Sequence, residues 1–131
     1  MNDYPEYMQL IKPDWAPPSF LFGPVWTFLY ITIAITFATV FWNVWKKKWP
    51  KSLLAPFILN LIFNLSFTPL QFGLKSNLLA AVDILLVLAT LIWAMWAIWP
   101  KARWITYVLI PYLLWVSFAT VLQLTITYLN F

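Results

Sequence analysis

The sequence contains no cysteine and no histidine, and only 9% of its 131 residues are charged. The two missing residue types exclude disulfides, thiol nucleophiles and proton relays through imidazole. They also exclude zinc or haem sites with Cys or His ligands. We therefore expect neither a metal site nor a covalently attached cofactor, and we assign no catalytic residue.

Apolar side chains, by contrast, make up 63% of the residues. Charge is absent from residues 20–45, 53–73 and 105–131. Uncharged apolar stretches of about 18 residues or more are typical of transmembrane helices. The sequence therefore predicts an all-α fold, an integral membrane helical bundle.

Prolines and lysines divide the chain into four predicted transmembrane helices, at about residues 20–45, 53–67, 77–99 and 102–129. Residues 1–19 form a polar tail and an entry loop, and residues 1–131 are predicted to be a single domain. Pro111 lies inside the last helix, where it cannot donate a hydrogen bond to the Tyr107 carbonyl. We expect a kink at this proline.

Most basic residues lie in two short loops, residues 46–51 and 101–103. By the positive-inside rule both loops face the cytoplasm, so both termini lie outside it, a pattern that suits a bacterial inner membrane. Because the basic residues border apolar segments, we expect a lipid membrane and not nucleic acid as the partner. Six tryptophans near these loops fit the headgroup level: Trp42, Trp45, Trp49, Trp96, Trp99 and Trp104.

Asp83 is the only charged residue deep within a predicted helix. A carboxylate is costly in lipid, so such residues face the bundle interior or a wet cavity. Two interpretations stay open, a proton- or ligand-responsive site and a carboxyl that hydrogen-bonds a neighbouring helix. The structural interpretation is slightly favoured because no basic residue or histidine lies at the same depth.

Two further polar patterns have both a structural and a binding interpretation. Asn60 and Asn64 are four residues apart and share one helix face. Such amides more often join helices than bind ligands. Trp115, Ala119 and Gln123 form a similar stripe on the last helix. This stripe fits either helix packing or a pocket wall, and spacing alone does not decide between them.

Three longer motifs follow one another along the chain. Residues 15–30 read W-x-P-P-x-x-x-x-G-P-V-W-x-x-x-Y, residues 64–73 read N-x-x-F-x-P-x-x-F-G, and residues 111–120 read P-Y-x-x-W-x-x-F-A-T. Together with Asp83, they resemble the TspO/translocator protein family, also called the peripheral benzodiazepine receptors. The matches keep their order over nearly the whole chain, so the chain is identified as a member of that family.

The resemblance implies a five-helix bundle that binds porphyrins, sterol-like lipids and benzodiazepine-type drugs. The expected function is that of a membrane receptor for an apolar planar ligand such as protoporphyrin or a related tetrapyrrole. Some family members are reported to degrade protoporphyrin in light, so that chemistry is a further hypothesis. By resemblance, Trp15 and Pro18 would lie in a lid, and the pocket would be formed by Phe22, Trp26, Asn64, Phe67, Trp115, Ala119 and Leu122.

The chain departs from the family pattern in four places. Only about 14 residues precede the first motif, where the family has a helix, so we expect the fold to lack that helix. Phe67 and Leu79 stand where pocket tryptophans are common, which weakens the expectation of photochemistry and drug affinity. No Lys or Arg follows Tyr128, unlike in the cholesterol pattern of animal members. Ala55 and Leu59 do not form a small-xxx-small spacing, so a homodimer is left open.

A function of a different class is a small proton-coupled exporter that uses Asp83. Four spans and one membrane carboxyl favour it, and the size resembles that of the small multidrug resistance transporters. Those transporters use a glutamate in their first helix, however, whereas Asp83 lies in the third predicted helix. We therefore treat transport as the alternative to ligand binding.

Overall fold

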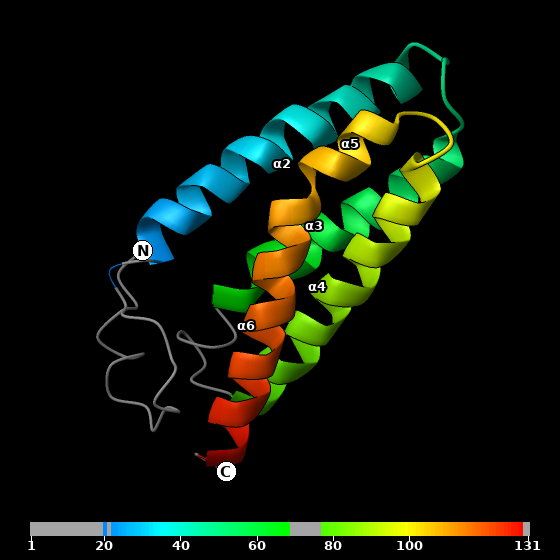
Figure 1. Cartoon of the computed structure of the whole chain (residues 1–131). Coiled ribbons are helices and arrows are strands. Elements are labelled where there is room, and N and C mark those ends of the chain that lie inside the picture. The colour runs from blue at the N-terminus through cyan, green and yellow to red at the C-terminus, as the bar shows by residue number, and fades with distance from the viewer. Residues whose placement is uncertain (1–19, 21, 69–76, 130–131) are drawn as a thin grey trace.

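The computed structural model describes residue 20, residues 22–68 and residues 77–129. No strand occurs in this part of the chain, and the predicted all-α class is confirmed (Figure 1). The elements are α2 (Phe22–Trp45), the short 3-10 helix η2 (Lys51–Leu53), α3 (Leu54–Thr68), α4 (Asn77–Ile98), α5 (Arg103–Val108) and α6 (Ile110–Leu129).

Three of these helices are long and apolar enough to cross a membrane, over Gly23–Trp45, Leu78–Ile98 and Ile110–Leu129. The prediction of an integral membrane protein is therefore supported by both length and composition. α3 is also apolar, but its 15 residues extend only about 22 Å. The hydrocarbon core of a bilayer is about 30 Å thick. The second predicted span is thus the shortest of the four.

Helix α4 lies between α3 and α6 and makes the most extensive contacts of the bundle with these two neighbours. α2 contacts α3, α5 and α6 less extensively. Figure 1 shows why: α2 crosses the others obliquely, and its N-terminal half diverges from α6. The distance between α2 and α6 therefore increases toward the N-terminal end of α2.

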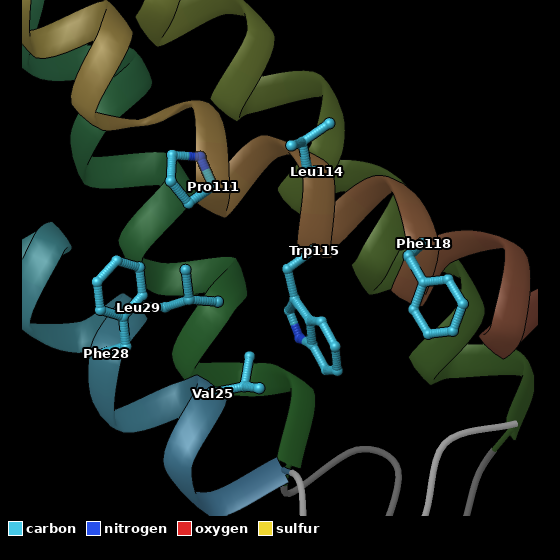
Figure 2. Close-up of a pocket in the computed structure, with 7 residues that line it drawn as sticks. All are labelled: Val25, Phe28, Leu29, Pro111, Leu114, Trp115 and Phe118. Carbon is cyan, nitrogen blue, oxygen red and sulfur yellow. The ribbon is translucent and has the colours of Figure 1, made fainter.

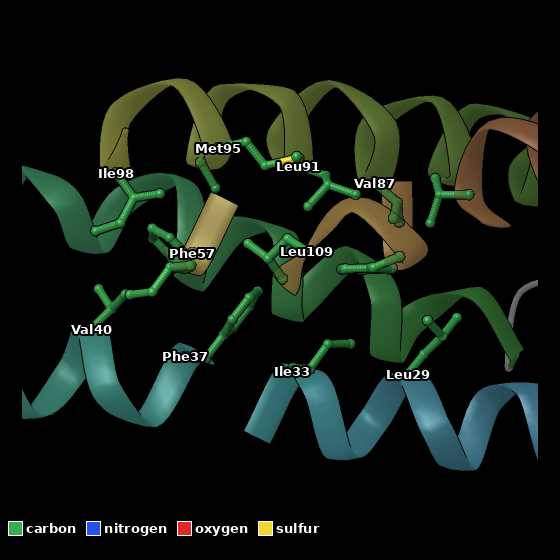
Figure 3. Close-up of a cluster of buried hydrophobic side chains, with 14 of the residues drawn as sticks. Leu29, Ile33, Phe37, Val40, Phe57, Val87, Leu91, Met95, Ile98 and Leu109 are labelled. Carbon is green, nitrogen blue, oxygen red and sulfur yellow. The ribbon is translucent and has the colours of Figure 1, made fainter. Parts of the chain in front are cut away.

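The hydrophobic core lies where all these helices approach one another (Figure 3). Phe37 of α2 meets Phe57 of α3 with ring centroids 4.9 Å apart and an edge-to-face angle of 86°. This geometry is favoured by the quadrupole of the aromatic ring. The core also includes Leu29, Ile33 and Val40 from α2, Val87, Leu91, Met95 and Ile98 from α4, and Leu109 between α5 and α6.

The kink predicted at Pro111 is present as a break between α5 and α6 (Figure 1). The Leu109 N–H still donates to the Ile105 carbonyl at 3.0 Å, and the Leu113 N–H donates to the Leu109 carbonyl at 2.9 Å. Pro111 has no N–H to continue this pattern. The Thr106 hydroxyl donates to the Met95 carbonyl at 3.1 Å and joins α5 to α4. The bend therefore leaves α5 packed on α4 while α6 takes a new direction.

Candidate functional site: an apolar groove between α2 and α6

An open groove of about 480 Å³ lies between α2 and α6 (Figure 2). Its volume is within the range of small-molecule sites in proteins. The indole nitrogen of Trp115 is the one polar side-chain atom among the lining residues. These residues are Val25, Phe28 and Leu29 from α2, and Pro111, Leu114, Trp115 and Phe118 from α6.

The groove follows from helical spacing on both sides. The α2 residues occupy positions i, i+3 and i+4, and the α6 residues occupy positions i, i+3, i+4 and i+7. Each set therefore forms one stripe on its helix. Pro111 is also the second residue of α6, next to the break from α5 at Leu109. The break that redirects α6 thus marks one end of the groove.

Trp115 is the central aromatic residue of this site. Figure 2 shows its indole extending from α6 into the space faced by Val25 and Leu29. The ring lies 5.7 Å from that of Phe118, at an angle of 39°. Trp115 also packs against the hydrophobic core, so its position is supported from behind. A supported aromatic surface beside an open apolar groove can stack against a planar ligand.

A chain of hydrogen bonds crosses the bundle behind the groove. The Asn64 amide donates to the Tyr112 hydroxyl at 2.6 Å, which joins α3 to α6. The Tyr112 hydroxyl donates in turn to the Asn60 carbonyl oxygen at 3.0 Å. The Asn60 amide donates to the Val87 carbonyl at 3.0 Å and to the Thr90 hydroxyl at 3.2 Å, both on α4. The two asparagines therefore join helices, the role that such amides most often have.

The same chain extends to α2 through Tyr30. The Tyr30 hydroxyl donates to the Asn64 side-chain oxygen at 3.4 Å, the longest bond of the series. Tyr30 also packs against Trp26, with ring centroids 5.5 Å apart. Asn64 thus uses both ends of its amide within the protein. A ligand that hydrogen-bonds Asn64 would most readily replace the long Tyr30 contact.

Sequence comparison with known proteins gives a match over almost the whole chain. Residues 1–129 match the sequence profile of the TspO/MBR family. The chain belongs to this family. It is 39% identical over 124 residues to the tryptophan-rich protein TspO of Chlorobaculum tepidum, a match that covers 95% of this chain and 78% of that protein.

Two more distant relatives have names that describe a role. The tryptophan-rich sensory protein of Cereibacter sphaeroides is 30% identical, over 95% of this chain and 77% of its own length. The human translocator protein is 33% identical, over 89% of this chain and 70% of its own length. Membership of the TspO/MBR family thus supports a membrane binding or sensory role for this chain.

Of the predicted site residues whose side chains the structure describes, one lines the groove. That residue is Trp115. Trp26, Phe67 and Ala119 are half-buried against the core, and Asn64 and Leu122 are buried. None of these five is among the lining residues. Trp15, Pro18, the lid and the expected absence of a preceding helix lie outside the described residues, as does the Phe22 side chain. The assignment of all these residues to a binding site stays a prediction.

Asp83 lies on the core-facing side of α4 and is only 4% exposed. Within the described part of the chain, its Oδ2 atom has no hydrogen-bond partner. Among the residues that the structure describes, no group of three or more potential ligands could hold a metal ion. The helix-joining bond expected in the structural interpretation is therefore not seen at Oδ2 within the described residues, and both interpretations of Asp83 stay open.

The sequence patterns did not predict a role for Tyr30, Tyr112 or Phe118. Tyr112 and Phe118 stand within the last quoted motif, and Tyr30 ends the first motif. A signal was present, because a buried tyrosine needs a partner for its hydroxyl. The i, i+3, i+4, i+7 spacing around Trp115 would also have identified the groove stripe.

Proposed function

We propose that this TspO/MBR protein binds an apolar planar ligand, such as protoporphyrin or a sterol-like lipid, in the groove between α2 and α6. The observation that supports the proposal best is the position of Trp115, whose indole lies in an apolar groove of about 480 Å³. A rigid ring system loses little conformational freedom on binding and gains contact with aromatic surfaces. The names of the sensory and translocator relatives are in keeping with this role.

Filling the groove tests this proposal. Leu114 lines the groove and is 65% exposed, so Leu114→Trp adds bulk there without disturbing the core. We expect protoporphyrin to bind the unmodified protein saturably and Leu114→Trp about fivefold more weakly, as measured by the absorbance of the porphyrin. Leu124→Trp is the matched control, because Leu124 is exposed on α6 but does not line the groove. Equal affinities of the two variants would contradict binding in the groove.

Proton-coupled transport is the second candidate function, and the buried Oδ2 of Asp83 favours it. Asparagine keeps the shape of the side chain but cannot release a proton. Transport of the ligand can be measured in reconstituted vesicles with a pH gradient. An exporter would be supported if Asp83→Asn abolished this transport while Trp115→Phe kept it. We expect instead that Asp83→Asn leaves the movement of ligand unchanged, because binding at the groove does not use this carboxyl.

A homodimer is a further part of the proposal, because a second protomer could cover the open groove between α2 and α6. Phe28, Ile31 and Ile35 are exposed on α2. Crosslinking in native membranes should then give a dimer through α2. A chain that crosslinks only as a monomer at all crosslinker concentrations would overturn this part and leave a bound lipid as the cover.

We also propose that the chain lies in a bacterial inner membrane with the loops at residues 46–51 and 101–103 in the cytoplasm. Six of the eight Lys and Arg residues lie in these loops. The absence of native cysteine allows a single introduced cysteine to report orientation. In intact cells, Lys48→Cys should resist a membrane-impermeant thiol reagent, whereas Asn130→Cys should react.

A further inference from the structure

One end of the bundle carries a concentrated positive charge. Its six basic residues are Lys46, Lys47, Lys48, Lys51, Lys101 and Arg103. We call this set the basic end. Among the described residues, the only carboxylate is Asp83, fifteen residues before the last residue of α4 and thus about 22 Å away along the helix. That separation exceeds the screening length at physiological salt, so no carboxylate of the described residues neutralises the basic end.

The two loops that form the basic end are close together in the fold. The short helix η2, which begins at Lys51, contacts both α2 and α4, and α2 contacts α5, which begins at Arg103. Figure 1 shows the end of α2 and the turn between α4 and α5 at the same end of the molecule. The six cations therefore form one surface although they come from distant parts of the sequence.

Tryptophan rings contact two of these cations. The Lys46 Nζ lies 4.8 Å from the centroid of the Trp42 ring, and the Arg103 Cζ lies 5.0 Å from that of Trp99. Both distances are within the range of cation–π contacts. Trp42 and Trp99 are exposed, as expected for rings at the headgroup level. Trp49 is half-buried against the core, and its place at the headgroup level stays a prediction.

Lys47 occupies a backbone conformation that normally favours glycine. Its φ is 61°, in the left-handed region. The Lys47 N–H donates to the Val44 carbonyl at 3.0 Å, and the Lys48 N–H donates to the Asn43 carbonyl at 2.9 Å. This is the Schellman pattern of helix ends, in which glycine fits without steric cost. The chain thus has a cation at a position where glycine would be less strained.

We propose that the basic end binds the phosphate headgroups of anionic phospholipids in the membrane leaflet on its own side. Clusters of four to eight Lys and Arg beside a transmembrane helix attract anionic lipids, and this surface has six. Lysine binds phosphate as a point charge. Tryptophans prefer the headgroup level, so Trp42 and Trp99 would place the Lys46 ammonium and the Arg103 guanidinium there. This site is separate from the groove between α2 and α6.

The preference for an anionic headgroup can be measured in vesicles that contain the full chain. Brominated phosphatidylglycerol and brominated phosphatidylcholine quench tryptophan fluorescence when they bind, and the ratio of their binding constants gives the preference. We expect the unmodified protein to prefer phosphatidylglycerol. Lys47→Asn should lower the preference by up to about fivefold, because asparagine tolerates the left-handed conformation but has no charge. Lys47→Arg should keep it.

Two controls separate a headgroup site from a general effect of charge. Lys75→Gln removes one charge two residues before α4 begins, at the other end of that helix, and should leave the preference unchanged. Inorganic phosphate at the concentration of the headgroups should not displace the lipid. The proposal is overturned by an unchanged preference in Lys47→Asn, by an equal loss in Lys75→Gln, or by displacement with free phosphate. The melting temperature of Lys47→Asn should be no lower than that of the unmodified protein, which excludes misfolding as the cause.

Discussion

Replacing Trp115 by alanine is expected to weaken the binding of protoporphyrin by at least about tenfold, or about 1.4 kcal/mol. The indole lies in the groove beside Phe118 and is supported by the core, so it offers a fixed surface to a planar ligand. Contacts between aromatic rings contribute about 0.5–1.5 kcal/mol beyond the area that they bury. Alanine removes both the stacking and most of the contact area. The dissociation constant is read from the porphyrin absorbance.

Trp96→Ala is the matched control for this substitution. Trp96 is 76% exposed on α4 and lies outside the groove, so the variant loses the same side chain elsewhere. Its affinity should equal that of the unmodified protein. Trp115→Phe should lie between the two, because phenylalanine keeps an aromatic surface. If Trp115→Ala bound protoporphyrin as tightly as Trp96→Ala, the groove would not be the binding site.

Tyr112→Phe is expected to destabilise the fold by about 1–2 kcal/mol. The substitution removes one hydroxyl but leaves the amide of Asn64 and the side-chain oxygen of Asn60 buried without this partner. An orphaned buried polar group costs about 1–3 kcal/mol in proteins in general. Hydrogen bonds between membrane helices average only about 0.6 kcal/mol and reach about 1.7. Because these bonds join membrane helices, the range for membrane proteins applies to each orphaned group. Two such groups together give the expected loss of about 1–2 kcal/mol.

Unfolding in mixed detergent micelles measures this loss. Tyr128→Phe is the control, because Tyr128 is 82% exposed and the removed hydroxyl is not held in the bundle, so its stability should not change. Adding Asn60→Leu and Asn64→Leu to Tyr112→Phe removes both orphaned groups and should recover part of the lost stability, because only the partly exposed Tyr30 hydroxyl then loses its partner. A Tyr112→Phe protein as stable as the Tyr128→Phe protein would show that the hydrogen-bond chain does not stabilise the bundle.

The helices could be predicted because their signals are local. Charge-free runs and flanking lysines indicated where they begin and end, and the missing N–H of Pro111 predicted the bend before α6. Helical spacing placed Asn60 and Asn64 on one face, and the hydrogen bonds confirm that both join helices. Such features depend only on residues within a few turns of one another.

The groove and the hydrogen-bond chain could not be predicted in the same way. Tyr30 meets Asn64 over 34 positions of the sequence, and Tyr112 meets Asn60 over 52. Periodicity shows which residues share a face of one helix, but not which faces meet. Trp115 was identified from its motif, whereas Val25 and Leu29 join it only because α2 crosses the bundle obliquely.

The most direct test of binding in the groove is fluorine NMR of protein labelled with 5-fluorotryptophan. The ring current of a bound porphyrin shifts the resonance of any indole that it stacks on, and Trp115→Phe and Trp96→Phe assign the two signals that matter. We expect the Trp115 resonance to shift saturably with protoporphyrin, while that of Trp96, exposed on α4, stays in place. A Trp115 resonance that does not move, or equal and unsaturable shifts of both, would contradict a ligand site between α2 and α6.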